Sequence, residues 1–233
     1  MLLEPKDRAQ PRREDMEPAD VTILDVAALA TAGRLGQNAL RQGQVGVLMV
    51  AGGQGSRLGF DGPKGAYPIG PVSRLPLFYF HARKVLALSE ASGRPVPFYI
   101  MTSNANDAAT RECFERHAWF GLCPENVFFF QQGMWPALDA QGRVMLETPG
   151  GIFMSPDGHG GTLSALERNG VLEDFKRRRL QTIFYFQVDN PLVAIADPVF
   201  LGFHLMHKAD LSLKGCAKRD PDEGLGMLVK RAD

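Results

Sequence analysis

The chain has 233 residues, 45% of them hydrophobic and 22% charged, a composition typical of an ordinary globular protein. Its 26 lysines and arginines balance 26 aspartates and glutamates, so no net positive charge draws it to nucleic acid or to an anionic membrane. Three cysteines without CxxC spacing argue against a structural zinc site or a disulfide framework and favour a reducing compartment. We therefore expect a cytoplasmic protein with no nucleic-acid or membrane partner.

Residues 1–44 are expected to form an N-terminal extension that is partly disordered and then helical. The first 20 residues carry many charges and three prolines, but no apolar stretch suited to a signal peptide or a membrane span. Apolar residues then recur at rough helical spacing over 25–41, where Gly33 and Gly36 predict a short or broken helix. The main domain is expected to occupy residues 45–233.

From residue 45 onward, predicted strands alternate with predicted helices. The run VGVLMVA at 45–51 is continuously apolar, which is typical of a strand buried on both faces. The alternation implies crossover connections and an α/β fold, with a mostly parallel central sheet and helices on both faces. Further strands are predicted at 96–102, 127–131, 182–188, 211–217 and 225–230, helices at 77–89, 108–117 and 198–208, a helix broken at Asn169-Gly170 over 162–179, and a hairpin or irregular insertion over 133–161.

A glycine-rich loop, GGQGSRLG, follows the first buried strand, and PKG follows at 63–65. Glycines let backbone N–H groups approach a phosphate closely, and Arg57 and Lys64 can neutralise its charge. The loop lacks the ending of a P-loop, and Leu58 stands where a dinucleotide-binding loop needs its third glycine, which argues against a nicotinamide-dependent oxidoreductase. The alternative is a tight turn with Arg57 paired on the surface.

Two further loops combine glycine or acidic residues with the start of a helix or the end of a strand. SPDGHGGT at 155–162 predicts another close-approach loop, with Thr162 as a helix cap; a plain turn before a helix is the alternative. Asp189 ends an apolar strand, where a carboxylate can hold a divalent cation that bridges phosphate oxygens. An Asx turn before Pro191 is the alternative there.

The remaining polar groups give weaker indications. Gln132 follows the strand at 127–131, and an amide matches the imide edge of a pyrimidine, although solvated glutamines are the simpler interpretation. The basic run at 176–179 is interpreted as a solvated helix end. No Ser-His-Asp or Cys-His arrangement announces a covalent nucleophile.

Taken together, VAGGQGSRLG, PKG, FFFQQGMWPA, SPDGHGG and FQVDNPLVAIADPVF resemble the motifs of the UDP-sugar pyrophosphorylases, closest to the UDP-N-acetylhexosamine branch. The resemblance runs from residue 44 to residue 230. It implies a nucleotidyltransferase fold related to glycosyltransferase type A. It also implies a Mg²⁺-dependent reaction in which UTP and a sugar 1-phosphate, either N-acetylglucosamine 1-phosphate or glucose 1-phosphate, give a UDP-sugar and pyrophosphate.

The resemblance assigns roles to eight residues of these loops. The implied catalytic residues, facing the triphosphate, are Arg57 and Lys64, and the implied metal ligand is Asp189. The implied nucleotide-binding residues are Gly52, Gly53, Gln132 and Gly158, with Gln132 on the uracil edge, and the implied sugar-binding residue is His159.

The chain departs from the family pattern in three places. His159 stands where eukaryotic N-acetylhexosamine enzymes have Asn, and GHG is similar to the glucose 1-phosphate and broad-specificity enzymes. The stretch at 75–78, Leu-Pro-Leu-Phe, lacks the Lys and the Ser or Thr expected before Leu-Phe. Family members also continue beyond Asp233, so we expect a fold that is incomplete at the C-terminus. A catalytically silent nucleotide-binding fragment or regulatory module is the alternative to an active enzyme.

Overall fold

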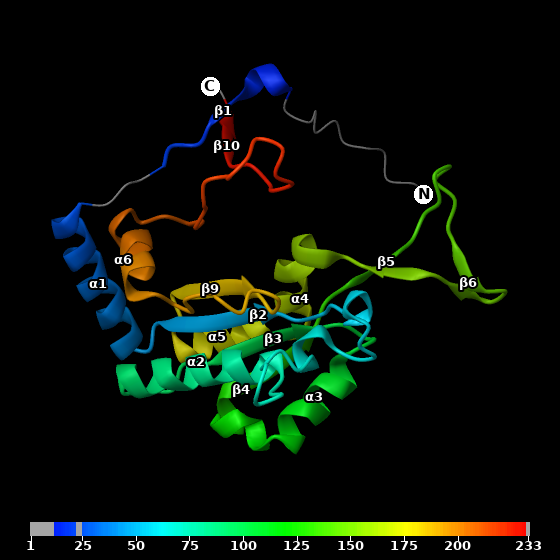
Figure 1. The fold of residues 1–233 in the computed structure, drawn as a ribbon, viewed down its shortest axis with the longest axis horizontal. Helices are drawn as coiled ribbons and strands as arrows, with labels where there is room; N and C mark the ends of the chain where they lie inside the picture. The colour runs from blue at the N-terminus through cyan, green and yellow to red at the C-terminus, as the bar shows by residue number, and fades with distance from the viewer. Residues whose placement is uncertain (1–11, 22–24, 232–233) are drawn as a thin grey trace.

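The computed structural model describes residues 12–21 and 25–231, and its centre is a four-stranded sheet. The strands are all parallel and lie in the order β4-β3-β2-β9 (Figure 1). This arrangement confirms the predicted α/β fold with a mostly parallel sheet. The strand bounds are β2 Val45–Val50, β3 Phe98–Thr102, β4 Val127–Gln131 and β9 Thr182–Gln187.

Helices cover both faces of the sheet, as predicted. Successive side chains of β2 point to opposite faces: Val47 and Met49 join the core under α2 and α3, whereas Leu48 joins the core under α4 and α5. The continuous apolar run is therefore buried on both sides. The bounds of these helices are α2 Leu77–Ser92, α3 Asp107–Arg116, α4 Thr162–Arg168 and α5 Val171–Arg178, so the predicted break at Asn169-Gly170 is confirmed.

The prediction of a short or broken helix at 25–41 is wrong, because α1 (Val26–Arg41) is continuous over 16 residues. The Asp25 carboxylate caps it by accepting a 2.7 Å hydrogen bond from the Ala28 N–H. The glycines serve close packing on α6 (Pro198–Met206), which lies beside α1 (Figure 1). A Cβ on Gly36 would overlap the carbonyl of Pro198, and one on Gly202 would overlap the carbonyl of Ala32.

The two predicted C-terminal strands are largely wrong. Residues 211–218 have no regular secondary structure, and β10 (Val229–Arg231) is the only strand among the described residues that follow them. It pairs antiparallel with β1 (Met16–Pro18), so part of the N-terminal extension that we expected to be disordered forms a short strand. Leu211 and Leu213 are largely exposed, since no neighbouring strand covers them among the described residues. The predicted disorder of residues 1–11 lies outside the described residues.

The predicted insertion at 133–161 is confirmed as an antiparallel extension beside the sheet. Strand β5 (Met134–Pro136) pairs with β8 (Met154–Pro156), and β6 (Leu146–Thr148) pairs with β7 (Gly151–Ile152). We call residues 134–156 the arm, since this segment projects away from the sheet (Figure 1). Its exposed apolar side chains include Trp135. None of the helices in the described ranges is long and apolar enough to cross a membrane.

The strand order places a topological switch beside β2. The chain runs from β2 to β3 and β4 on one side, and β9 then adds to the other side of β2. In open α/β sheets, ligands bind outside the carboxyl ends of the strands at such a switch. The loops that follow β2, β4 and β9 are therefore the first place to look for a site.

Candidate active site

A pocket of about 240 Å³ lies at the carboxyl ends of β2, β4 and β9. We call it the cleft. It brings together loops that are separated by up to 137 residues in sequence, counted from Gly52 to Asp189. Of the eight residues with predicted roles, seven line it: Gly52, Gly53, Lys64, Gln132, Gly158, His159 and Asp189.

Arg57 is the predicted residue that does not line the cleft. It lies in the short 3-10 helix η2 (Ser56–Leu58), and its side chain is exposed. The turn that carries it closes on itself, because the Gly55 N–H donates to the Gly62 carbonyl at 2.8 Å and the Phe60 N–H donates to the Gly55 carbonyl at 3.2 Å. The predicted contact between Arg57 and phosphate stays a prediction.

Gly52, just after β2, and Gln132, just after β4, lie against each other in the lining of the cleft. A Cβ on Gly52 would come within 2.8 Å of the Gln132 Nε2, so a larger residue there would require the Gln132 amide to move from its present position. The Gln132 backbone N–H continues the β3–β4 ladder by donating to the Thr102 carbonyl at 2.9 Å. Gln132 is 8% exposed, and its amide lines the cleft. Its donor and acceptor atoms are thus placed to bind a ligand edge.

Lys64 and Asp189 face each other across the switch point. The Lys64 Nζ lies 3.0 Å from the Asp189 Oδ2, and both side chains remain partly exposed. The Lys64 backbone N–H donates to the Gly53 carbonyl at 3.0 Å, which ties the PKG turn back onto the glycine-rich loop. An ammonium and a carboxylate at one spot provide a cation for phosphate and a hard oxygen ligand for a metal.

Asp189 fits a divalent cation whose other ligands come from a bound phosphate and water. Mg²⁺ is typically held by one or two carboxylates plus substrate phosphates, and the Asp189 carboxylate lies in the cleft with 46% of its side chain exposed. Across residues 12–21 and 25–231, no group of three or more His, Cys, Asp or Glu side chains forms a complete metal cage. The site therefore suits a substrate-borne metal and does not suit a structural one.

His159 belongs to the 3-10 helix η6 (Gly158–Gly161), at the rim of the cleft. Its Nδ1 is hydrogen-bonded to the hydroxyl of Tyr185 on β9, and the two rings pack edge to face. Tyr185 fixes one nitrogen of the imidazole, so Nε2 is the atom left to meet a ligand. The predicted capping role of Thr162 is wrong, because Gly161 is the N-cap residue of α4 and no side chain caps that helix.

Three buried polar residues that sequence reasoning missed hold these loops. Asn106 is 1% exposed; its Nδ2 donates to the carbonyls of Ala51 and Gly53 at 2.9 and 3.2 Å. Asp157 lies under η6, where a Cβ on Gly133 or Gly161 would overlap its carboxylate, and its Oδ2 lies 3.7 Å from an Arg168 nitrogen. The third, His81, contacts the turn after β9. No local sequence pattern marks Asn106 or His81, because the carbonyls that they contact lie more than 50 residues away in the chain.

The basic run at 176–179 is only partly the solvated helix end that we predicted. Lys176 and Arg177 are exposed, but Arg178 is half-buried and lies over the ring of Phe128, 4.7 Å from its centroid. Arg177 and Arg178 both pair with the buried carboxylate of Asp174. The run therefore stabilises the α5 face of the sheet, away from the cleft.

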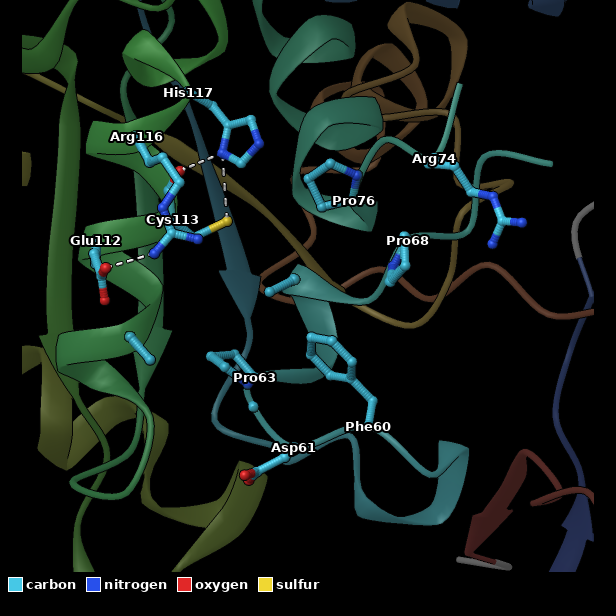
Figure 2. A pocket seen from close by; sticks show the side chains of 13 residues that line it. Phe60, Asp61, Pro63, Pro68, Arg74, Pro76, Glu112, Cys113, Arg116 and His117 are labelled. Carbon is cyan, nitrogen blue, oxygen red and sulfur yellow. Dashed lines mark hydrogen bonds and ion pairs between the residues drawn. The ribbon is translucent and has the colours of Figure 1, made fainter. Parts of the chain in front are cut away.

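A larger hollow of about 330 Å³ lies between α3 and the loop at 60–76 (Figure 2). Its charged groups do not converge: Arg116 pairs with Glu112 on α3, and Arg74 points away from that helix (Figure 2). Cys113 and His117 line one wall, with Sγ and Nδ1 3.9 Å apart. Burial raises the pKa of the Cys113 thiol, which keeps it protonated and unsuited to nucleophilic attack. The cleft is therefore the better candidate site.

Comparison with known proteins identifies the family. Residues 4–233 match the family model described as UTP–glucose-1-phosphate uridylyltransferase. Among curated relatives, the chain is 42% identical to the UDP-N-acetylglucosamine pyrophosphorylase of Saccharomyces cerevisiae, over 85% of this chain and 42% of the yeast protein. It is 38% identical to the UDP-N-acetylhexosamine pyrophosphorylase-like protein 1 of Xenopus tropicalis, over 97% of this chain and 47% of the frog protein.

Solved structures give the same result. The UDP-N-acetylglucosamine pyrophosphorylase of Trypanosoma brucei, crystallised with an inhibitor, matches with a TM-score of 0.83 and 32% identity over 96% of this chain and 47% of that chain. This match confirms the nucleotidyltransferase fold that the motifs implied. The chain spans less than half the length of each of these three relatives. It belongs to the UTP–glucose-1-phosphate uridylyltransferase family.

Proposed function

We propose that the chain binds UTP in the cleft and transfers its uridylyl group to a sugar 1-phosphate, releasing pyrophosphate. The observation that carries this proposal is the meeting of a glycine-lined strand end, the Lys64–Asp189 pair and the Gln132 amide in one pocket at the switch point. We propose residues 45–233 as the UTP-binding domain and residues 1–44 as an extension to it. A cytoplasmic location belongs to the same proposal.

Each residue has a distinct task in this reaction. Gln132 binds the uracil edge through its amide, and Gly52 keeps the space that the amide and the base need. Gly53 and Gly158 let the nucleotide approach the backbone closely. Lys64 neutralises the triphosphate, and Arg57 reaches it from the rim. His159, oriented by Tyr185, offers Nε2 to the sugar phosphate.

The chemical step is a displacement at phosphorus. An oxygen of the sugar phosphate forms a bond to the α-phosphorus of UTP, and the bond from that phosphorus to the bridging oxygen of the β-phosphate breaks, so pyrophosphate leaves with the electron pair. Such a step needs positioning and charge neutralisation and no covalent enzyme intermediate. When bound, Mg²⁺ supplies additional neutralisation of phosphate charge, and Asp189 would hold it.

A pyrophosphate-release assay tests this proposal. The purified chain is given UTP, MgCl₂ and either glucose 1-phosphate or N-acetylglucosamine 1-phosphate, and we expect release with at least one of them. Lys64→Met and Asp189→Asn should each lower the rate about 100-fold, the scale reported for loss of a group that stabilises transition-state charge. Arg111→Met, which removes an arginine of α3 that does not line the cleft, is the control and should retain the rate.

One observation favours a second candidate function. Because the chain spans less than half of each relative, it can carry a nucleotide-binding function without turnover. UTP binding in calorimetry together with no pyrophosphate release for either sugar phosphate would support this silent module and contradict the transferase. Absence of UTP binding would contradict both functions.

A further inference from the structure

We infer that His81 on α2 is a positioning residue, which fixes the Asp189 carboxylate by donating a hydrogen bond to the carbonyl of Val188, and that Lys84 completes this clamp. The inference deepens the proposed function, on which it rests, because it takes Asp189 as the residue that meets the metal bound to UTP. Neither side chain lines the cleft. Both act through the backbone of the turn that carries Asp189.

The turn after β9 has little support of its own. Residues 188–193 form no helix or strand, and Asp189, Asn190, Pro191 and Leu192 are all exposed. Within the turn, the Asn190 N–H donates to the Gln187 carbonyl at 3.1 Å, and a second backbone bond at 3.4 Å is long. A carboxylate on such a turn needs outside contacts to hold one position.

Helix α2 supplies three such contacts. The His81 Nε2 lies 2.7 Å from the Val188 carbonyl oxygen, and the Lys84 Nζ donates to the carbonyls of Pro191 and Val193 at 2.5 and 3.0 Å. His81 and Lys84 are three residues apart and so lie on one face of the helix. They hold the turn on both sides of Asp189, at the residue immediately before it and at the residues two and four positions after it.

The protonation of His81 suits this role. A carbonyl can only accept, so Nε2 must carry the hydrogen, and Nδ1 is buried with no hydrogen-bond partner in the part of the chain that the structure describes. The imidazole is fully buried, with its ring centroid 5.0 Å from that of Phe186 on β9. Burial lowers its pKa to about 4, so the donor is a neutral imidazole at neutral pH.

The same helix also supports the opposite wall of the cleft. Phe78 on α2 packs so closely on Gly65 that a Cβ there would overlap its ring, and Gly65 directly follows Lys64. One helix therefore contacts both the turn that carries Lys64 and the turn that carries Asp189. Helix α2 therefore contributes to the relative position of the ammonium and the carboxylate.

The test is the effect of Mg²⁺ on UTP affinity, which needs no turnover. UTP dissociation constants of the full chain are measured by calorimetry in EDTA and in MgCl₂, and their ratio reports the coupling between metal and nucleotide. In His81→Phe, which keeps a ring but removes the donor, we expect this ratio to fall about tenfold toward that of Asp189→Asn, since displacements near 1 Å weaken such sites strongly. UTP affinity in EDTA should stay within about twofold of wild type. His81→Gln, which restores an N–H donor, should recover most of the ratio.

Two matched controls separate positioning from general destabilisation. Val85→Ala removes buried volume from the same helix without removing a hydrogen bond to the turn, and it should keep the wild-type ratio. Lys84→Met should lower the ratio two- to threefold, whereas Arg83→Met, at the exposed neighbouring position, should not. If His81→Phe does not fold, the comparison of Lys84→Met with Arg83→Met tests the inference. Equal ratios of the two dissociation constants in these variants would overturn it.

The outcomes distinguish the inference from the function on which it rests. A wild-type chain that does not bind UTP, or binds it equally with and without Mg²⁺, overturns the proposed metal role of Asp189 and the clamp with it. A wild-type chain that shows the coupling, together with a His81→Phe variant that shows it undiminished, overturns the clamp alone.

Discussion

The cleft and the arm are both built mainly from irregular backbone, yet they are held in different ways. The cleft loops are tied to the core by buried side chains, such as Asn106 below the glycine-rich loop and His81 below the turn after β9. The arm relies on its own backbone bonds, such as the Ala137 N–H to the Phe153 carbonyl at 2.8 Å, and exposes large apolar side chains.

This difference shows which loops of the molecule are held in one conformation. Burying a polar group costs free energy unless the group is hydrogen-bonded. A buried side chain that bonds to a loop carbonyl therefore favours the one loop conformation in which that bond forms. Water can replace either partner of an exposed hydrogen bond in a hairpin, so such a bond favours one backbone conformation only weakly. The comparison predicts that changes behind the cleft alter both stability and binding, whereas changes on the arm, apart from Pro156, which lines the cleft, alter neither. Three measurements test it.

The largest expected effect is acid destabilisation through His81. Burial lowers its pKa from 6.5 to about 4, with Lys84 acting in the same direction and the Val188 carbonyl and Asp189 opposing it. Between these values the unfolded state binds more protons, so stability falls as the pH falls from about 6.5 to about 4. By pH 4.5 the loss from this group is about 2 to 3 kcal/mol, taking about 1.4 kcal/mol per pKa unit.

Urea denaturation at pH 7 and pH 4.5 measures this effect. His81→Gln cannot titrate, so the wild type should lose about 2 to 3 kcal/mol more than this variant between the two pH values. The carboxylates contribute equally to both proteins and cancel in the comparison. An equal loss of unfolding free energy in the two proteins would show that His81 is not the buried neutral group described above. It would also contradict the idea that buried side chains hold the cleft loops more firmly than the arm.

The second effect is steric and is confined to the cleft. Gly52→Ala places a methyl group within 2.8 Å of the Gln132 amide, whereas a Cβ on Gly150, a glycine of the arm outside the cleft lining, would meet nothing within 4 Å. We expect Gly52→Ala to weaken UTP binding about tenfold, or about 1.4 kcal/mol, and Gly150→Ala to change it by less than threefold. Titration calorimetry of the two variants gives the answer. Equal weakening would mean that the space beside Gln132 has no special role.

The core of the fold follows from local sequence, whereas the eight predicted site residues come from the loop motifs together with their resemblance to a known family. Continuous apolar runs such as 45–51 predict strands buried on both faces, and turn residues after those strands mark the loops, because both signals lie within a few residues. Seven of the eight predicted residues meet in the cleft, since parallel strands bring their carboxyl ends to one edge.

The failures share a different physical cause. Gly36 looks like a helix breaker until the backbone of α6 is seen to approach it, more than 160 residues along the chain. His81 looks like an ordinary helical residue until its bond to Val188, 107 residues away, is known. The residues at 211–217 alternate like a strand, but no partner strand lies beside them among the described residues. In each case a distant neighbour decides the outcome, and a local window does not contain it.

The smallest expected effect belongs to the arm. Trp135→Ser removes a side chain that is 61% exposed and lies on β5, outside the residues that line the cleft. Exposed substitutions away from special features change stability by about 0.5 kcal/mol or less, so the unfolding free energy and the UTP affinity should both stay near wild type. Urea denaturation and UTP titration of this one variant check both quantities. A loss of more than about 1 kcal/mol in unfolding would show that the arm is packed as firmly as the cleft loops. An unchanged stability with weaker UTP binding would instead make the arm a part of the binding site.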